Sequence, residues 1–213
     1  MALNLIVLGP PGAGKGTQAE RFAKSRGIPR VSTGDILREA VAARSELGLR
    51  AKSIMDRGEL VGDDVMIGIV KERLDRPDAI GGFVLDGFPR TVAQAEALDG
   101  IMAGRDPLIV VDIQVPEAEL VRRLATRLVC ERDGTNAEPA ASACPKCGGR
   151  LVQRTDDNED VVRERLVVYE RKSRPLVEFY STRATFKSID GAQPADRVAQ
   201  DLAAAIAAVG GRS

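Results

Sequence analysis

The sequence predicts an α/β fold in which helices cover both faces of a parallel β-sheet. Short apolar runs alternate with segments of helical periodicity along the chain, and this alternation is typical of β-α-β units. Residues 107–115 are almost continuously apolar, as expected of a strand that is buried on both faces. Residues 3–8 form another apolar run, which leads directly into a glycine-rich turn and a helix.

The glycine-rich turn occupies residues 9–17 and has the sequence GPPGAGKGT. A tight turn before a helix leaves several backbone N–H groups pointing into one concavity, where the positive end of the helix favours a phosphate. Lys15 adds a mobile positive charge for the outer phosphates. Gly16 stands where phosphate loops usually carry a hydroxyl residue, and Thr17 comes one position later. The alternative is a structural turn with an incidental lysine, but the flanking strand and helix favour nucleotide binding.

The helix after this turn is predicted to end at Gly27, and residues 28–31 are predicted to form a second short strand. Ser32 and Asp35 have the spacing of a helix cap, and apolar residues follow at helical spacing. A cap accounts for these two residues without any ligand, but it does not account for Arg38.

Residues 39–75 alternate apolar and charged positions, which favours short helices of an insertion rather than strands. Breaks between these helices are predicted at Gly48, Gly58 and Gly62.

An apolar run at residues 81–86 ends in Asp86 and is followed by a glycine turn. Because the carboxyl ends of parallel strands line one edge of a sheet, we expect Asp86 to lie beside the phosphate loop. An aspartate there can hold magnesium directly or through water, although an Asp-Gly turn without a ligand is the alternative. Pro89 restricts the turn before Arg90 and so helps to keep that guanidinium in one place.

The remaining elements follow from the same patterns. Further helices are predicted at residues 91–98, 117–128, 157–169 and 194–209. The strand at residues 107–115 is predicted to be central, and a last strand is predicted at residues 184–190. No period is present in residues 130–149, so a small module held by something other than an apolar core is expected there.

That module contains all three cysteines of the chain. An uneven number of cysteines within so short a segment indicates metal ligands in a reducing compartment rather than disulfides. Three thiolates and one carboxylate suit tetrahedral zinc, and three free thiols are the alternative. The candidate ligands are Cys130, Asp133, Cys144 and Cys147.

The composition of the 213-residue chain limits its functions. With 31 basic and 31 acidic side chains the net charge is zero, so no global field attracts nucleic acid or anionic lipid. No apolar run approaches the length of a membrane span. We therefore expect one main domain in a cytoplasmic protein that binds neither nucleic acid nor membranes. We also expect a monomer. The chain has no histidine, so its chemistry must use lysine, arginine, carboxylates and metal.

Three segments together resemble the signatures of the adenylate kinase family, of the bacterial type with a long lid. They are GPPGAGKGTQA at residues 9–19, STGD at residues 32–35 and DGFPRT at residues 86–91. In this family a glycine stands between the lysine and the threonine of the phosphate loop. The family holds magnesium largely through water and the aspartate that corresponds to Asp86.

The resemblance implies a three-layer P-loop nucleoside monophosphate kinase fold, with a five-stranded parallel sheet, a helical insertion and a small lid. The core would comprise residues 1–31, 62–125 and 158–213. The insertion, residues 32–61, would bind AMP, and residues 126–157 would form the lid, with structural zinc in some family members.

The implied reaction is the reversible, magnesium-dependent transfer of a phosphoryl group from ATP to AMP, which gives two ADP. The catalytic residues would be Lys15, Arg38, Asp86, Arg90, Arg127, Arg154 and Arg165. ATP would bind to Gly12, Ala13, Gly14, Lys15, Gly16, Thr17, Arg123, Arg127 and Gln193. AMP would bind to Thr33, Arg38, Glu59, Leu60, Val61, Gly87, Phe88, Pro89, Arg90, Gln94, Arg154 and Arg165.

Two alternatives remain open from the sequence. A kinase of the same fold could act on UMP, CMP or another nucleoside monophosphate, although Thr33 and residues 91–94 resemble the AMP-specific pattern. A zinc-knuckle protein with a regulatory phosphate loop could bind nucleic acid. Zero net charge, five phenylalanines, two tyrosines and no basic stripe argue against that second alternative.

Overall fold

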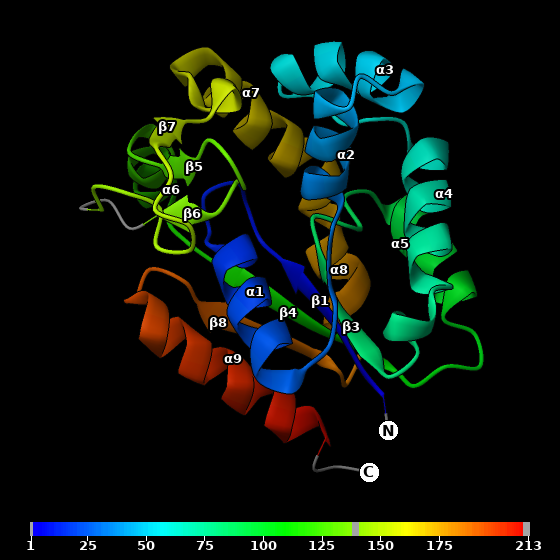
Figure 1. Cartoon of the computed structure of the whole chain (residues 1–213). Helices are drawn as coiled ribbons and strands as arrows, with labels where there is room; N and C mark the ends of the chain where they lie inside the picture. Colours follow the sequence, from blue (N-terminus) through cyan, green and yellow to red (C-terminus); the bar gives the residue numbers. More distant parts are fainter. Residues whose placement is uncertain (1, 138–140, 211–213) are drawn as a thin grey trace.

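The computed structural model describes residues 2–137 and 141–210, which form two β-sheets surrounded by helices (Figure 1). Residues 138–140 of the predicted lid, and residues 1 and 211–213 of the predicted core, lie outside the described residues. The elements in chain order are β1 (Leu3–Leu8), α1 (Lys15–Arg26), β2 (Arg30–Ser32), α2 (Thr33–Ala42), α3 (Glu46–Asp56), α4 (Asp63–Leu74), β3 (Gly82–Asp86), α5 (Val92–Ile101), β4 (Leu108–Gln114), α6 (Glu117–Ala125), β5 (Leu128–Cys130), β6 (Asn136–Ala137), β7 (Leu151–Gln153), α7 (Glu159–Val168), α8 (Pro175–Ser181), β8 (Phe186–Asp190) and α9 (Ala195–Gly210).

The larger sheet has five parallel strands in the order β2-β3-β1-β4-β8 within the described residues. Its register places Leu5 between Val84 of β3 and Ile109 of β4. The predicted five-stranded parallel sheet is thus confirmed, with β1 at its centre and β4, the strand predicted to be central, between β1 and β8. Because all five strands are parallel, the residues that follow β1, β2 and β3 meet at one edge.

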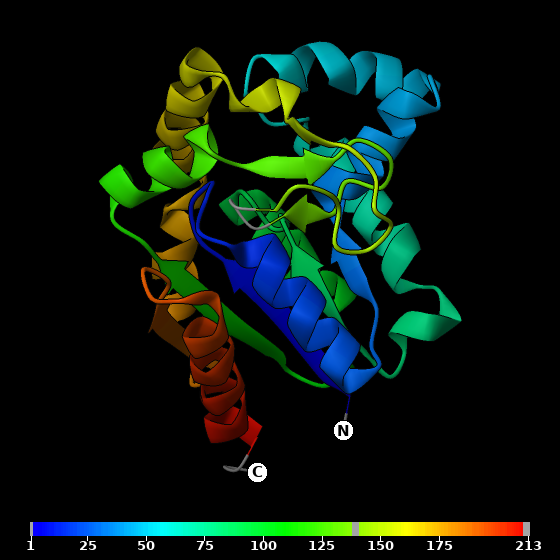
Figure 2. The ribbon, with the colours of Figure 1, turned by 60° about the vertical axis from the view of Figure 1, so that its left-hand side comes forward.

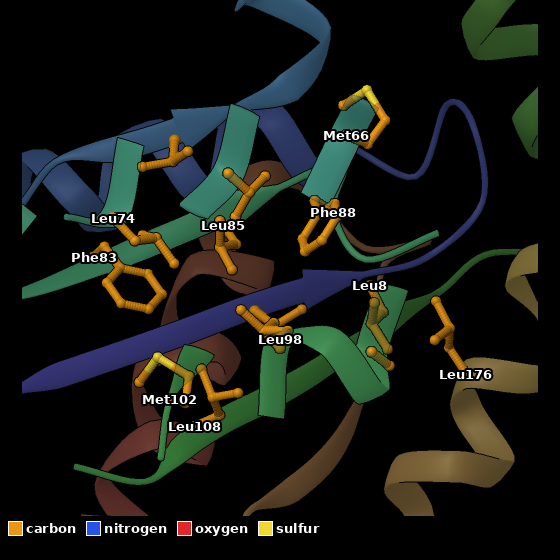
Figure 3. Close-up of a cluster of buried hydrophobic side chains, with 14 of the residues drawn as sticks. Leu8, Met66, Leu74, Phe83, Leu85, Phe88, Leu98, Met102, Leu108 and Leu176 are labelled. Carbon is orange, nitrogen blue, oxygen red and sulfur yellow. The ribbon is translucent and has the colours of Figure 1, made fainter. Parts of the chain in front are cut away.

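Side chains alternate between two apolar clusters, one on each face of this sheet. In β3, Phe83 and Leu85 pack on one face, whereas Val84 packs on the other. The first face is covered by α4, α5 and α8, and Figure 3 shows part of its buried cluster. The second face is covered by α1, α6 and α9. The prediction of a sheet buried on both faces is therefore confirmed.

Helix boundaries follow the predicted caps. Gly14 caps the start of α1 and Gly27 caps its end, and both adopt the left-handed conformation that suits glycine. The Ser32 hydroxyl accepts a hydrogen bond from the Asp35 backbone N–H at 3.3 Å, so the predicted cap of α2 forms. Thr91 caps α5 in the same way by accepting from the Gln94 N–H at 3.2 Å.

The predicted helix break at Gly48 is wrong, because Gly48 is buried inside α3. A Cβ atom at this position would lie 2.0 Å from the carbonyl oxygen of Ala40 in α2. The glycine therefore permits a close approach of two successive helices. The other two predicted breaks, at Gly58 and Gly62, fall between α3 and α4 as expected.

The smaller sheet is antiparallel, in the order β6-β5-β7. Only β6 lies wholly within residues 130–149, the segment that lacks a sequence period, and β5 and β7 stand at its two ends. The predicted helix over residues 117–128 is too long, because α6 ends at Ala125 and Leu128 already begins β5. Leu128 pairs with Gln153 of β7, so strand pairing ends the helix there. This sheet and helices α2 and α3 lie above the same edge of the larger sheet (Figures 1 and 2).

The longest described helix is α9, with 16 residues. It packs Val198, Leu202 and Ile206 in the interior and leaves its opposite side to solvent. Across residues 2–137 and 141–210, no helix has both the length and the apolar character that a bilayer span requires.

Candidate nucleotide-binding site

The turn between β1 and α1 lies at the carboxyl edge of the larger sheet. Gly9, Gly12 and Gly14 have φ angles of 138°, 85° and 86°, which side-chain-bearing residues rarely adopt. A Cβ atom at Gly9 would also lie 2.6 Å from the Ile113 carbonyl oxygen. Glycine is therefore required for the turn, and the amino end of α1 offers its unpaired N–H groups and positive dipole to an anion.

Lys15 is curled over this turn, and its Nζ donates to the carbonyl oxygens of Gly9 at 2.8 Å and Pro10 at 2.9 Å. Burial lowers the pKa of Lys15 to about 7, and the positive charges of Arg90 and Arg165 add to that shift, while Asp86 opposes it. The negative charge near the ammonium group in this structure is therefore too small to offset its burial and the nearby arginines. A bound polyphosphate would supply that charge and raise the pKa again.

We expect ATP binding to become weaker as the pH rises above 7, by up to about tenfold per pH unit, because Lys15 must then be protonated on binding. At pH 8 the free nucleotide is fully ionised, so proton uptake close to one per ATP would come from the protein. Calorimetric titrations in two buffers of different ionisation enthalpy measure this uptake. Lys15→Met should abolish it, and its absence in the unsubstituted protein would contradict the lowered pKa.

Asp86 ends β3 and lies beside the phosphate loop, as predicted. Its Oδ2 atom accepts from Nη2 of Arg30 at 2.7 Å and would be 3.3 Å from a Cβ atom at Gly16. A larger residue at position 16 would crowd this buried carboxylate. The absence of a side chain at Gly16 therefore leaves room for the Asp86–Arg30 pair at the start of α1.

A first cavity, of about 80 Å³, lies between the β3–α5 turn and the predicted AMP-binding insertion. Its lining contains most of the predicted AMP-binding residues: Thr33, Arg38, Glu59, Leu60, Val61, Gly87, Arg90, Gln94 and Arg165. Phe88 does not line it, because its side chain is buried in the apolar cluster below (Figure 3).

A second cavity, also of about 80 Å³, adjoins the phosphate loop. Gly9, Lys15 and Pro89 contribute to its lining but not to that of the first cavity. Arg90 and Arg165 line both cavities. Two guanidinium groups therefore stand where the space beside Lys15 meets the space beside Arg38.

Hydrogen bonds fix the walls of the first cavity. The Thr33 hydroxyl donates to the Gly87 carbonyl oxygen at 2.8 Å, and the Gln94 side-chain oxygen accepts from the Arg90 backbone N–H at 2.8 Å. The other end of the Gln94 amide donates to Asp63 at 2.8 Å. Asp63 thus supports the turn that carries Arg90, a role that no sequence pattern indicated.

The arginines around these cavities perturb one another. Burial, followed by the charges of neighbouring arginines, lowers the pKa of Arg90 and of Arg154 to about 10. Burial likewise lowers the pKa of Arg165, although Asp156 counteracts it. Arg38 contributes to all three shifts. Desolvated positive charges held together in this way form a site that a polyanion would stabilise.

Two carboxylates between β7 and α7 hold Arg127 of the predicted lid and Arg165 of α7. Arg127 Nε donates to Asp157 Oδ2 at 2.7 Å, and Arg165 Nη1 lies 3.2 Å from Asp157 Oδ1. Arg165 Nη1 also lies 3.1 Å from Asp156 Oδ2. The side chain of Asp157 is fully buried, so its charge is used to place these two guanidinium groups. No sequence pattern singled out either aspartate, and the only local signal was an acidic pair two residues after Arg154.

The four predicted metal ligands come together in two similar turns. The Gly134 N–H donates to the Cys130 carbonyl oxygen, and the Gly148 N–H donates to that of Cys144, each at 2.9 Å. Both glycines have a φ angle of 68°. These matched turns present the ligand atoms of their first residues toward a common point.

The ligand atoms of Cys130, Asp133, Cys144 and Cys147 all lie within 4.8 Å of one another. The sulfurs of Cys130 and Cys147 are 3.5 Å apart, which is too far for a disulfide. Sulfurs that share a tetrahedral zinc ion are separated by about 3.8 Å. The donor set and its spacing therefore fit zinc.

Comparison with known proteins identifies the family. The family model described as adenylate kinase matches residues 7–185. The chain belongs to the adenylate kinase family. A protein named adenylate kinase from Archaeoglobus fulgidus is 50% identical over 210 residues, which cover 95% of this chain and 97% of the relative. Relatives of the same name from Magnetococcus marinus and Staphylococcus epidermidis are 47% and 48% identical, over 95% and 94% of this chain and 99% and 97% of their own lengths.

Family membership confirms the resemblance that the phosphate loop, the STGD segment and the DGFPRT segment indicated. It identifies the chain as an enzyme of a nucleotide-binding kinase family. Gly16, which departs from the general phosphate-loop pattern, is thus part of an adenylate kinase loop.

Two residues predicted to contact ATP line neither of the two cavities described above. Arg123, on α6, pairs with Glu119 through a 2.7 Å hydrogen bond. Gln193 precedes α9 and donates to Asp201 at 2.9 Å. Gln18 of α1 donates to the Ala195 carbonyl oxygen at 2.8 Å, so the segment near Gln193 is joined to the phosphate-loop helix. Their roles toward ATP stay predictions.

Proposed function

We propose that the protein catalyses the reversible, magnesium-dependent transfer of the terminal phosphoryl group of ATP to AMP, giving two ADP and so balancing the adenine nucleotides. The observation that carries this proposal is the pair of adjoining cavities that share Arg90 and Arg165. A phosphate chain on Lys15 and a monophosphate on Arg38 would approach each other at these two guanidinium groups.

The chemistry needs positioning and positive charge rather than a proton acceptor. Phosphoryl transfer places attacking and leaving oxygens in line and spreads negative charge over the equatorial oxygens. Arginine suits this task, because its planar fork binds phosphate oxygens in pairs and keeps its charge. The phosphate of AMP is already an ionised nucleophile, so the lack of histidine in the chain is no obstacle.

On the donor side, we assign the phosphates of ATP to residues 12–17, Arg127 and Lys15, and its base to Arg123 and Gln193. Asp86 would hold Mg²⁺, largely through water. The buried Asp86 carboxylate already accepts a cationic partner, Arg30, at 2.7 Å, so its surroundings suit a positive ion. When bound, magnesium supplies charge neutralisation among the phosphate oxygens.

On the acceptor side, we assign the phosphate of AMP to Arg38, Arg90, Arg154 and Arg165. We assign the adenosine to Thr33, Gln94, the backbone of residues 59–61 and the backbone of residues 87–90. The cavity lined by Thr33 and Gln94 supports this assignment. The alternative acceptors are UMP, CMP and other nucleoside monophosphates.

A coupled assay that detects ADP formation from ATP tests the function directly. With equal concentrations of AMP, GMP, UMP or CMP as acceptor, we expect AMP to give the highest kcat/KM by a wide margin. A higher value with UMP or CMP would support the alternative kinase. Absence of any ADP, together with salt-dependent binding of single-stranded nucleic acid, would overturn both.

We propose that residues 32–61 and 126–157 are parts that close over a core made of the other residues. In this structure Gly58 of the first part packs against α7 of the core, because a Cβ atom at Gly58 would lie 3.0 Å from Arg165 and 3.1 Å from the Val161 carbonyl oxygen. Gly58 and Asp156, one from each of the two parts, also line the first cavity together. Such closure would exclude water, the competing acceptor. We also propose that the enzyme acts as a monomer in the cytoplasm, without binding nucleic acid or membranes, because its zero net charge favours neither.

We further propose that Cys130, Asp133, Cys144 and Cys147 bind one structural zinc ion in the lid. The short strands β5, β6 and β7 offer little apolar surface, so a metal would supply the stability that a core does not. The spacing of the four ligand atoms supports this assignment.

Protein purified without chelator should contain close to one zinc ion per chain, as measured by elemental analysis. Cys144→Ser should lower that ratio to near zero, because three ligands hold zinc far more weakly than four. Glu131→Gln, which changes an exposed carboxylate in the other turn, between Cys130 and Asp133, is the matched control and should keep the metal. A ratio near zero in the unsubstituted protein, with three titratable thiols, would reject the site.

A further inference from the structure

Arg30 lies among three carboxylates at the carboxyl edge of the larger sheet. Its Nη2 atom is 2.7 Å from Oδ2 of Asp86 and 3.0 Å from Oδ2 of Asp35. Its Nη1 atom is 3.4 Å from Glu20. The register of β2 and β3 pairs Ser32 with Asp86, which brings the Arg30 side chain within reach of that carboxylate.

The contacts of Arg30 continue to the acceptor side. Asp35 uses Oδ2 for Arg30 and Oδ1 for Nη2 of Arg38. The charged groups thus form an uninterrupted series, Asp86, Arg30, Asp35 and Arg38. One end lies beside the phosphate loop, and the other lines the cavity assigned to AMP.

Arg30 is only 21% exposed, and Nη2 would lie 3.4 Å from a Cβ atom at Gly16. Neither family resemblance nor the sequence pattern singled it out, because it appeared only as part of a short strand. Its hydrogen bonds, however, hold the side chain in one position. Two of its three nitrogens contact Asp86, which anchors the guanidinium to the core.

We propose that Arg30 is a positioning residue for the acceptor phosphate, anchored on Asp86 and acting through Asp35 on Arg38. This inference rests on the proposed function. Because Asp35 is shared between two guanidinium groups, it does not neutralise Arg38 alone. Removal of Arg30 takes away one of the two positive charges in this series, so the net charge near the incoming phosphate becomes more negative by one.

The decisive variant is Arg30→Gln, which keeps a polar side chain but removes the charge and the fork. Without Arg30, Asp35 has Arg38 as its principal partner and holds it away from the phosphate. We expect the Kd of AMP, measured by calorimetry without ATP or magnesium, to rise about tenfold. The KM of AMP should rise by a similar factor, whereas the KM of ATP should change by less than about threefold.

Arg73→Gln is the matched control, because Arg73 is 19% exposed and makes a two-point contact with Asp78 outside the two cavities. It should leave the Kd of AMP within about twofold of the unsubstituted value. Arg30→Lys restores the charge without the fork and should give an intermediate Kd. A Kd within twofold of the unsubstituted value for Arg30→Gln would overturn the inference.

A second comparison tests whether Arg30 acts through Asp35. In an Asp35→Asn background, Arg30→Gln should change the Kd of AMP by less than about threefold. The same tenfold change in both backgrounds would show a direct effect of charge and contradict the relay. Failure of the unsubstituted protein to bind AMP would refute the proposed function itself, which separates that result from a failure confined to Arg30.

Discussion

Replacing Arg90 with alanine should lower turnover about a thousandfold while leaving the thermal midpoint near that of the unsubstituted protein. Arg90, like Arg165, lines both cavities, so it is placed to contact donor and acceptor phosphates together. Burial and the nearby charge of Arg165 lower the pKa of Arg90 to about 10, which means that the folded protein disfavours its charge. Its removal therefore relieves repulsion, and only the hydrogen bond to the Gly87 carbonyl oxygen is lost.

Initial rates with AMP and ATP, together with a thermal melt of each variant, measure this separation of activity from stability. Arg105→Ala is a suitable control, because Arg105 donates to the Leu74 carbonyl oxygen at 3.2 Å near the opposite edge of the sheet. It should keep near-normal turnover. Near-normal turnover of Arg90→Ala would refute the assignment of Arg90 to the transferring phosphate.

The position of Arg90 illustrates what the sequence alone could predict. The apolar run before Asp86 and the glycine turn after it are local patterns. Parallel strands then bring Asp86 to the edge where the phosphate loop lies. The strand, the turn that follows it and the parallel order of the sheet are therefore enough to predict that Asp86 and Arg90 lie near the phosphate loop.

Contacts between distant segments could not be predicted in this way. Gly48 resembles a helix break in sequence, and only the approach of Ala40 from the preceding helix explains why it lies inside α3. Asp157 resembles a surface acid before a helix, yet the fold buries it against Arg127. Strands β5, β6 and β7 have only two or three residues, so no period exists to indicate them.

Arg30 is another residue whose role could not be predicted from local sequence patterns. A basic residue in a short strand has no distinguishing pattern, and its importance depends on three carboxylates from α1, α2 and β3. The main chain of the site follows from local sequence rules, whereas the ion pairs that orient its side chains depend on the tertiary structure.

For the apolar core beside the site we expect the reverse of the Arg90 result, a large loss of stability with little change in turnover. Phe83→Ala should lower the free energy of unfolding by about 3–5 kcal/mol and the thermal midpoint by about 10 °C. Phe83 is fully buried in β3 between β2 and β1, among side chains that include Leu74 and Met102 (Figure 3). Because the change leaves a cavity rather than an altered charge, kcat at 15 °C should stay within roughly twofold of the unsubstituted value.

Chemical denaturation and rates at 15 °C test this expectation. Phe83→Leu keeps most of the buried volume and should cost less than about 1.5 kcal/mol, and Leu49→Ala, at a position 65% exposed, should cost less than about 0.5 kcal/mol. A large loss of kcat in folded Phe83→Ala would mean that the packing under β3 also sets the position of Asp86, three residues along the strand. If the rate is kept, Arg90→Ala and Phe83→Ala together separate the groups that bind phosphate from the sheet that carries them.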